Sequence, residues 1–122
     1  MYNIEFYRTE KGECDIEDFL EDLRKRSPRD KSAKVLFKRV SLQLSMLSNN
    51  GTRISDKMCK HISEDIWELR PGDNRILFFY WTNNTFVLLH HFIKKTQETP
   101  VREIEKAKRE RKDYLRQKRG GK

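Results

Sequence analysis

Two histidines and two lysines stand in one apolar stretch of the sequence, "FVLLHHFIKKTQETP". His90 and His91 lie inside the apolar run, and Lys94 and Lys95 lie where it ends. Imidazole carries protons near neutral pH, because the unperturbed side chain titrates at about pH 6.5. Ammonium groups stabilise negative charge that develops in a transition state. These residue types indicate proton transfer on an anionic substrate.

Alternation along the predicted strand separates the two histidines. Successive side chains of a strand point to opposite faces, so His90 and Lys94 are expected on one face and His91 and Lys95 on the other. The apolar run predicts a central strand that is covered on both faces. A histidine in such a strand is more often structural than catalytic. The lysines leave the core beside a predicted helix start, where a phosphate can bind.

The segment "ELRPGDNRILF" adds two arginines. If "PGDN" forms a hairpin loop, Arg70 and Arg75 lie directly opposite each other, with Cβ atoms about 5 Å apart. Like charges so placed repel unless water screens them or an anion lies between them, and guanidinium matches the geometry of phosphate oxygens. In the alternative interpretation the arginines splay into solvent or pair with Glu68 and Asp73. We take them as candidate phosphate ligands.

We expect no metal and no cofactor. Cys59, His61 and the His90-His91 pair lack the two-residue gap of zinc knuckles, and no carboxylate cluster for magnesium accompanies the basic strand ends. Cleavage of RNA without a metal needs a base for the 2′-hydroxyl, an acid for the leaving 5′-oxygen and cations for the transition state. Histidine, lysine and arginine meet these three needs.

Composition predicts one small cytoplasmic domain. A chain of 122 residues suits one hydrophobic core. Its 35% apolar and 38% charged residues are segregated into segments, which argues against global disorder. Cys14 and Cys59 are unpatterned, as in reduced cytoplasmic proteins. No apolar stretch reaches the roughly 20 residues of a membrane span, and the N-terminus lacks a signal-peptide pattern.

The formal net charge of +8 is concentrated toward the C-terminus. Ten Lys and Arg stand against four Asp and Glu between Arg102 and Lys122. Such a basic block points to nucleic acid or to an acidic protein surface, although a charge run is as often a solvated helix face.

Periodicity predicts a strand followed by a helical hairpin in the first half of the chain. Residues 2–7 have near alternation of β-favouring types. The first helix is expected to begin with an N-cap at Asp15 and to end before Pro28. The second runs over residues 30–47 and closes at "SNNG", where Asn and Gly tolerate a left-handed backbone.

Three strands and a helix are predicted for the second half. "DIWELR", "RILFFYW" and "FVLLHHFIKK" read as an antiparallel meander, and Thr99-Pro100 starts the final helix. The fold class is therefore α+β, in the order β-α-α-β-β-β-α. We expect a single domain over residues 1–117 and a basic disordered tail at 118–122.

With these residues assembled, the sequence resembles the RelE/HigB-like toxins of bacterial type II toxin-antitoxin systems, in particular the phage-derived Gp49-like branch. The resemblance is carried by "IWELRPGDNRILFFY" and "VLLHHFIKKTQETPVREIEKAKRERKDYL". With the strand "IEF" and the helical hairpin it covers almost the whole chain. "HHFIKKTQETP" is specific to that branch, and the first half is generic. The resemblance implies a RelE-like fold, with the hairpin packed on an antiparallel sheet.

The same resemblance implies a function and partners. It implies an mRNA interferase, that is, an endoribonuclease that cleaves message at the ribosomal A site and so inhibits translation. It also implies a HigA-like helix-turn-helix antitoxin that neutralises the toxin and, together with it, binds operator DNA. Contact with DNA is expected only through that complex.

Residue by residue, the resemblance assigns roles at the site. The basic strand residues of the family correspond to Arg70 and Arg75, and its strand-end lysine corresponds to Lys94 or Lys95. His90, His91 and His61 are the candidate proton carriers. The candidate RNA contacts are Lys57, Lys60 and His61 before the meander and Lys108, Arg109 and Lys112 in the final helix. Relatives place a tyrosine or an acid near the end of the active site. Here the late tyrosine is Tyr114, inside the final helix, so the base stays unassigned.

Two other functions fit the same residues. One is a non-nucleolytic toxin of this fold that acts on a protein such as DNA gyrase, as the ParE branch does. The other is a non-catalytic nucleic-acid-binding module, which explains the charge of +8 and a steep salt dependence of binding. A non-catalytic module does not explain why the two arginines lie opposite each other.

Overall fold

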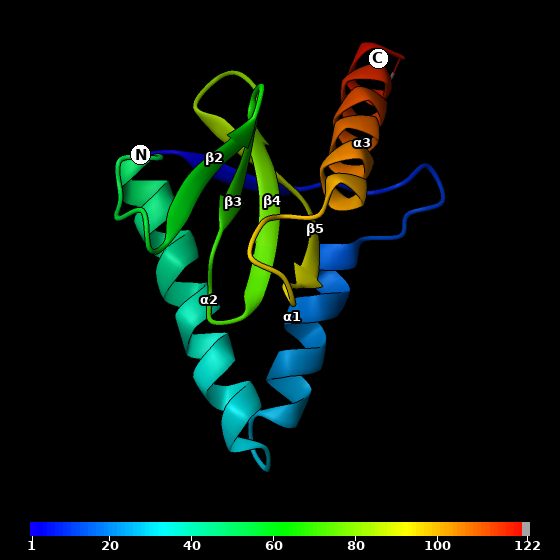
Figure 1. Cartoon of the computed structure of the whole chain (residues 1–122). Helices are drawn as coiled ribbons and strands as arrows, with labels where there is room; N and C mark the ends of the chain where they lie inside the picture. Colours follow the sequence, from blue (N-terminus) through cyan, green and yellow to red (C-terminus); the bar gives the residue numbers. More distant parts are fainter. Residues whose placement is uncertain (121–122) are drawn as a thin grey trace.

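A five-stranded mixed sheet forms the centre of the molecule, with α1 and α2 on one face and α3 on the other (Figure 1). The computed structural model describes residues 1–120. The elements are β1 (Asn3–Phe6), α1 (Asp15–Arg26), α2 (Lys31–Asn50), β2 (Cys59–Ser63), β3 (Ile66–Leu69), β4 (Asn74–Tyr80), β5 (Thr85–Ile93) and α3 (Val101–Gly120). None of the helices described here is long and apolar enough to cross a membrane.

The strands lie in the order β1-β5-β4-β3-β2. Strands β3, β4 and β5 form the antiparallel meander expected from the sequence, and the α+β class is confirmed. Two features differ from the expectation. Strand β2 was not predicted, because "CKHIS" is short and half polar, and it pairs at the sheet edge. Strand β1 pairs in parallel with β5, Asn3 opposite Thr85, so the sheet is mixed rather than antiparallel.

The helical hairpin begins one residue away from the expected cap. Cys14 is the N-cap of α1, and its Sγ accepts from the backbone N–H of Glu17. The prediction of an N-cap at Asp15 was therefore wrong, because the Asp15 carboxylate instead accepts hydrogen bonds from His91. The second helix starts as expected, with the Asp30 side chain accepting from the N–H of Ala33.

Apolar side chains fill both faces of the sheet. The core under the hairpin includes Ile16, Leu23, Leu47, Phe78 and Leu88, and the core under α3 includes Ile66, Leu77, Phe79, Val87 and Ala107. Each of these is at most 1% exposed. A fully buried Leu, Ile or Phe contributes roughly 1.5–3 kcal/mol relative to exposure. Burial on both faces confirms the prediction of a central, covered β5.

A bulge in β5 determines which helix each histidine meets. The partners of Leu77 and Phe78 on β5 are separated by one extra residue, Leu89. As a result, Leu89 and His90 both belong to the α3 face, whereas His91 belongs to the α1 face. The predicted separation of the histidines is confirmed, although the bulge interrupts the simple alternation on which it was based.

His90 ties α3 to the sheet. Its ring is fully buried, with Nε2 2.9 Å from Glu103 Oε1 and Nδ1 2.5 Å from Glu110 Oε1. The one ring therefore joins two carboxylates of α3, one turn or more apart, to the strand. Two further bonds hold the middle of α3, because Tyr7 Oη donates to Asp113 and Tyr114 Oη donates to Glu5.

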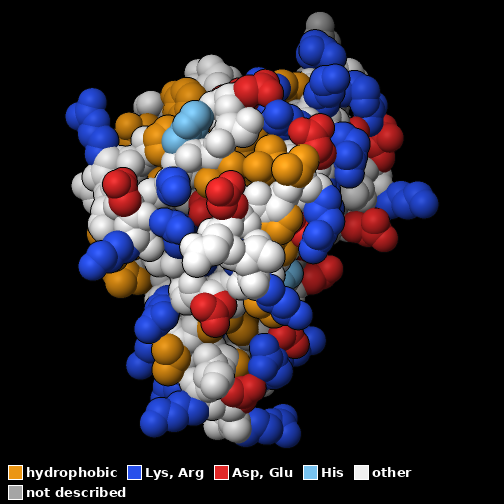
Figure 2. Space-filling model, in the orientation of Figure 1, with side chains coloured by type: hydrophobic (Ala, Val, Ile, Leu, Met, Phe, Trp, Pro, Cys, Tyr) orange, Lys and Arg blue, Asp and Glu red, His pale blue; other side chains and the backbone are white. Residues whose placement is uncertain are grey.

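Basic side chains gather at both ends of the molecule (Figure 2). The hairpin end has eight Lys and Arg against one Asp over residues 24–39. The turn of that hairpin lies far from the C-terminal end of α3 (Figure 1). The predicted C-terminal block forms α3, which continues through Gly120. Residues 118–120 of the expected disordered tail are therefore helical, and residues 121–122 lie outside the described residues.

Replacing His90 by Leu should destabilise the protein strongly. The variant leaves Glu103 and Glu110 without their shared partner, and breaking a buried charge pair costs about 3–5 kcal/mol. Urea unfolding measures the change in the free energy of unfolding. Lys106→Gln, on the exposed face of the same helix, is the control and should stay within about 0.5 kcal/mol. If His90→Leu lowered the free energy of unfolding by less than about 1 kcal/mol, the bonds from His90 to Glu103 and Glu110 would not be what holds α3 to the sheet.

Candidate functional site

Arg70 and Arg75 stand on opposite sides of the β3–β4 hairpin. The register pairs Leu69 with Ile76, which brings the two arginines opposite each other one step beyond. Glu68 Oε2 lies 3.3 Å from Arg70 Nε and 3.6 Å from Arg75 Nε. The Glu68 side chain is only 1% exposed. The anion between the arginines is therefore supplied by the protein, as the pairing alternative of the sequence analysis expected for Glu68.

The two guanidinium groups differ in freedom. Arg75 is 12% exposed, and its Nη1 donates to the carbonyls of Gly72 at 2.9 Å and Asn74 at 2.8 Å. Burial lowers the pKa of the Arg75 guanidinium, which nevertheless stays charged at neutral pH. Arg70 is 23% exposed, and its Nη1 donates to the Asp56 carbonyl at 3.0 Å. The Arg75 guanidinium is thus held by backbone carbonyls at the turn, and the Arg70 guanidinium is more accessible to a ligand.

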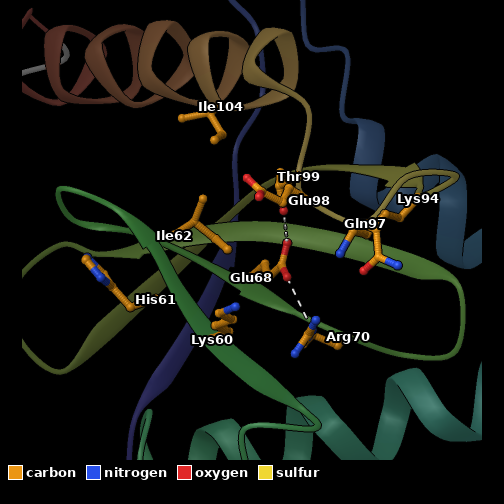
Figure 3. Close-up of a pocket in the computed structure, with 10 residues that line it drawn as sticks. All are labelled: Lys60, His61, Ile62, Glu68, Arg70, Lys94, Gln97, Glu98, Thr99 and Ile104. Atoms are coloured by element: carbon orange, nitrogen blue, oxygen red, sulfur yellow. Dashed lines mark hydrogen bonds and ion pairs between the residues drawn. The ribbon is translucent and has the colours of Figure 1, made fainter.

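A groove of about 300 Å³ opens beside Arg70, between the sheet and the start of α3 (Figure 3). Its lining comprises Lys60, His61, Ile62, Glu68, Arg70, Lys94, Gln97, Glu98, Thr99 and Ile104. Thr99 Oγ1 donates to Glu68 Oε1 at 2.8 Å. Figure 3 shows the Glu68 carboxylate held between Thr99 and Arg70. Both carboxylate oxygens are therefore engaged within the protein.

The groove favours an anionic ligand. Lys60, Arg70 and Lys94 place three cations on it against the exposed carboxylate of Glu98, and His61 adds an imidazole. The Glu68 charge is already shared by the two arginines. Charges and donors held in place before a ligand arrives stabilise a developing negative charge at little reorganisation cost. A phosphate group with a transferable proton nearby fits this arrangement.

His90 and His91 lie outside the groove. His90 bonds to α3, and the His91 ring stacks on Phe19 with 3.9 Å between centroids. His91 Nδ1 lies 2.5 Å from Asp15 Oδ1, which also accepts from the His91 backbone N–H. Burial by itself raises the pKa of Asp15, but the bonds from His91 outweigh burial and hold that pKa below its ordinary value. His61 is the histidine that lines the groove.

The other predicted residues are divided between four places. Lys94 and Lys60 line the groove, whereas Lys95 lines a separate hollow and Lys57 is exposed before β2. Lys108, Arg109 and Lys112 line a third hollow on α3, and Lys108 pairs with Glu64 at 2.8 Å. Tyr114, on the inner face of α3, is 6% exposed and packs against Phe79 of the sheet, so it does not line the groove.

Glu68 and Thr99 are two groove residues that the sequence analysis did not select as site residues, although it named Glu68 as an alternative partner of the arginines. A signal for Glu68 was present, because period-two spacing places it on the same strand face as Arg70. Its apolar neighbours Trp67 and Leu69 also indicated a strand buried in part. Nothing in the local sequence connects Thr99 to Glu68, because their contact joins segments that are distant in the chain.

Comparison with known proteins places the chain in a family context. A family model described as "Phage derived protein Gp49-like (DUF891)" matches residues 21–112, which contain the whole groove. No curated protein gives a significant match.

Solved structures give weak matches. The YoeB dimer from Staphylococcus aureus is 15% identical, with 78% of this chain and 97% of that chain covered and a TM-score of 0.47. A YoeB-YefM complex from the same organism is 14% identical, with 79% and 98% covered and a TM-score of 0.48.

Replacing Glu68 by Gln should create a site for free anions. The variant keeps the side-chain shape but leaves Arg70 and Arg75 without their counter-ion, so we expect a loss of about 2–4 kcal/mol in the free energy of unfolding. Sulfate should raise the melting temperature of the variant more than that of the parent, because the ion replaces the lost charge. Thermal unfolding in sulfate and chloride at equal ionic strength measures this. Glu13→Gln, at an exposed position outside the groove, is the control, and an equal response to sulfate would contradict the counter-ion role.

The Asp15–His91 contact should give a pH-dependent contribution to stability. The pKa of Asp15 is lower in the folded protein than the value of about 3.9 in unfolded chains. Its contribution is therefore present above about pH 4 and is lost as the pH falls through the folded pKa. Asp15→Asn should cost about 1–2 kcal/mol at pH 6 and less at pH 3. Urea unfolding at both pH values is the measurement, with Asp18→Asn as the control. A cost independent of pH would count against the contact.

Proposed function

The chain belongs to the phage-derived Gp49-like family, and we propose that it is the toxin of a type II toxin-antitoxin system, an endoribonuclease that cleaves mRNA on the ribosome without a metal ion. The observation that carries the proposal is the groove that Lys60, His61, Arg70 and Lys94 line, with Arg70 held in place by the buried carboxylate of Glu68. Cations and a proton carrier of this kind are what phosphodiester cleavage requires.

The groove residues take separate roles in the proposed reaction. Arg70 and Lys94 bind the scissile phosphate, and Glu68 orients the Arg70 guanidinium from behind. The 2′-oxygen attacks phosphorus while His61 accepts its proton at Nδ1, because Nε2 donates to the Glu64 carbonyl. The bond to the 5′-oxygen breaks, and that oxygen takes a proton from Lys94 or Lys60. The products are a 2′,3′-cyclic phosphate and a 5′-hydroxyl, so atoms and charges balance.

The basic ends of the molecule support a large RNA partner. The groove has room for little more than one phosphate and its ribose, so binding energy for a longer RNA must come from elsewhere. Residues 24–39 and the outer face of α3 supply dense positive charge at a distance from the groove. Such surfaces attract phosphates at long range. We infer that they dock on ribosomal RNA while the groove meets the message.

Neutralisation by a helix-turn-helix antitoxin of the HigA type completes the proposal. An acidic segment of such a partner is suited to cover the cationic groove or the basic face of α3. A short helix-turn-helix reading frame beside this gene would support the assignment. Co-expression of that neighbour should restore growth to cells that express this chain.

Primer extension on a cellular message after induced expression tests the function. Discrete cuts near codons, with translation required for cutting, are the expected result. Intact message together with DNA damage would overturn the nuclease assignment and point instead to a protein target such as DNA gyrase.

Single replacements in the groove should separate activity from folding. Arg70→Gln and His61→Gln should each lower cleavage by about 10²–10³, the usual cost of a lost transition-state contact or proton carrier. His61 is exposed, so the fold should persist, which circular dichroism checks. Lys11→Gln, at an exposed loop position, is the control with full activity. A folded Arg70→Gln protein that still arrests growth would refute the role of the groove.

A further inference from the structure

A second hollow, of about 560 Å³, lies on the other side of residues 94–100. Its lining comprises His91, Phe92, Ile93, Lys95, Thr96, Pro100 and Arg102. We call it the β5 hollow. Among the described residues, it shares no lining residue with the groove beside Arg70. The adjacent lysines at the end of β5 therefore belong to different places, Lys94 to the groove and Lys95 to the β5 hollow.

His91 is held rigidly at the wall of the β5 hollow. Asp15 Oδ1 accepts from the His91 backbone N–H at 2.9 Å and from Nδ1 at 2.5 Å. The ring stacks on Phe19 and is 26% exposed. Because Asp15 occupies Nδ1, the nitrogen left for a ligand is Nε2. A carboxylate that fixes one ring nitrogen in this way orients the other as a donor or an acceptor.

Two cations accompany His91. Lys95 is exposed and forms no ion pair with a carboxylate of the described residues. Arg102 is 82% exposed, and its Nε lies 3.8 Å from Glu103 Oε2, which is a weak surface contact. Helix α3 begins at Val101, so the positive end of its dipole lies beside the same hollow.

No carboxylate is among the described residues that line the β5 hollow, and the two that contact His91 and Arg102 are already engaged. Asp15 bonds to His91, and the other oxygen of Glu103 bonds to His90 inside the protein. Neither is free to neutralise Lys95. The hollow thus combines an oriented imidazole, two loosely held cations and a helix start, which together suit an anion. Ile93 and Pro100 add apolar wall.

We propose that the β5 hollow is a second phosphate subsite, which binds a neighbouring phosphate of the RNA strand while the groove at Arg70 takes the scissile one. The proposal rests on the proposed function for the identity of the ligand. Residues 94–100 lie between the two subsites, so the strand crosses this segment, with Lys94 on one side and Lys95 on the other. Ile93 and Pro100 face the ribose or base between them.

Titration with inorganic phosphate tests the subsite without any cleavage. The NMR signals of the His91 ring are followed at fixed pH and ionic strength. We expect a saturable shift with phosphate and none with chloride. Lys95→Gln should weaken phosphate binding about threefold, the effect of one exposed charge contact. Lys11→Gln, at an exposed loop position, is the matched control and should leave the His91 response unchanged.

A short 2′-O-methyl RNA, which cannot be cleaved, tests the path of the strand. Its affinity is measured over a range of salt concentrations. Lys95→Gln should reduce the slope of log K against log salt by about 0.7, the value for one phosphate contact on a single strand. Lys11→Gln should leave the slope unchanged.

The outcomes separate this proposal from the nuclease assignment. A His91 signal that ignores phosphate, or an RNA salt slope that Lys95→Gln does not change, would overturn the second subsite even if message is cleaved in cells. Shifts in both measurements would support the subsite, whatever primer extension shows about cleavage.

Discussion

Hydrogen bonds from two adjacent histidines hold the central strand to helices on both of its faces. His90 bonds to Glu103 and Glu110 of α3, and His91 bonds to Asp15 of α1. An imidazole buried in an apolar strand without partners would be costly. These carboxylates remove that cost and fix two helices relative to β5. Residues 94–100 connect β5 to α3, so the position of both hollows depends on these bonds.

The groove shows how a buried carboxylate allows two arginines to lie close together in a small domain. Glu68 separates Arg70 from Arg75 and is itself fixed by Thr99, so the cations are in place before a ligand arrives. The groups are anchored on strands, which hold side chains more precisely than loops do. Because Glu68 already pairs with Arg70, a phosphate that enters the groove has to compete with Glu68 for the Arg70 guanidinium.

Sequence patterns predicted the parts of the fold that depend on local chemistry. Alternation and turn composition located the β3–β5 meander, and the opposition of Arg70 and Arg75 followed from its register. The β1–β5 pairing depends on a distant partner, which periodicity does not encode, whereas β2 pairs with its neighbour β3 and was missed because "CKHIS" is short and half polar. Glu68 was not selected as a site residue, because a carboxylate on a strand ordinarily faces solvent and here its burial depends on Thr99. The Leu89 bulge likewise exceeded what alternation can predict.

The parallel pairing of β1 with β5 has a consequence for biosynthesis. Asn3 finds its partner only when Thr85 has left the ribosome, and the groove needs Thr99 as well. Translation adds about 5–20 residues per second, so β1 has no partner strand for several seconds after its own synthesis. A nascent chain therefore lacks the assembled cationic site until Thr99 has left the ribosome. The order of synthesis thus makes the groove one of the last parts of the sheet region to be completed.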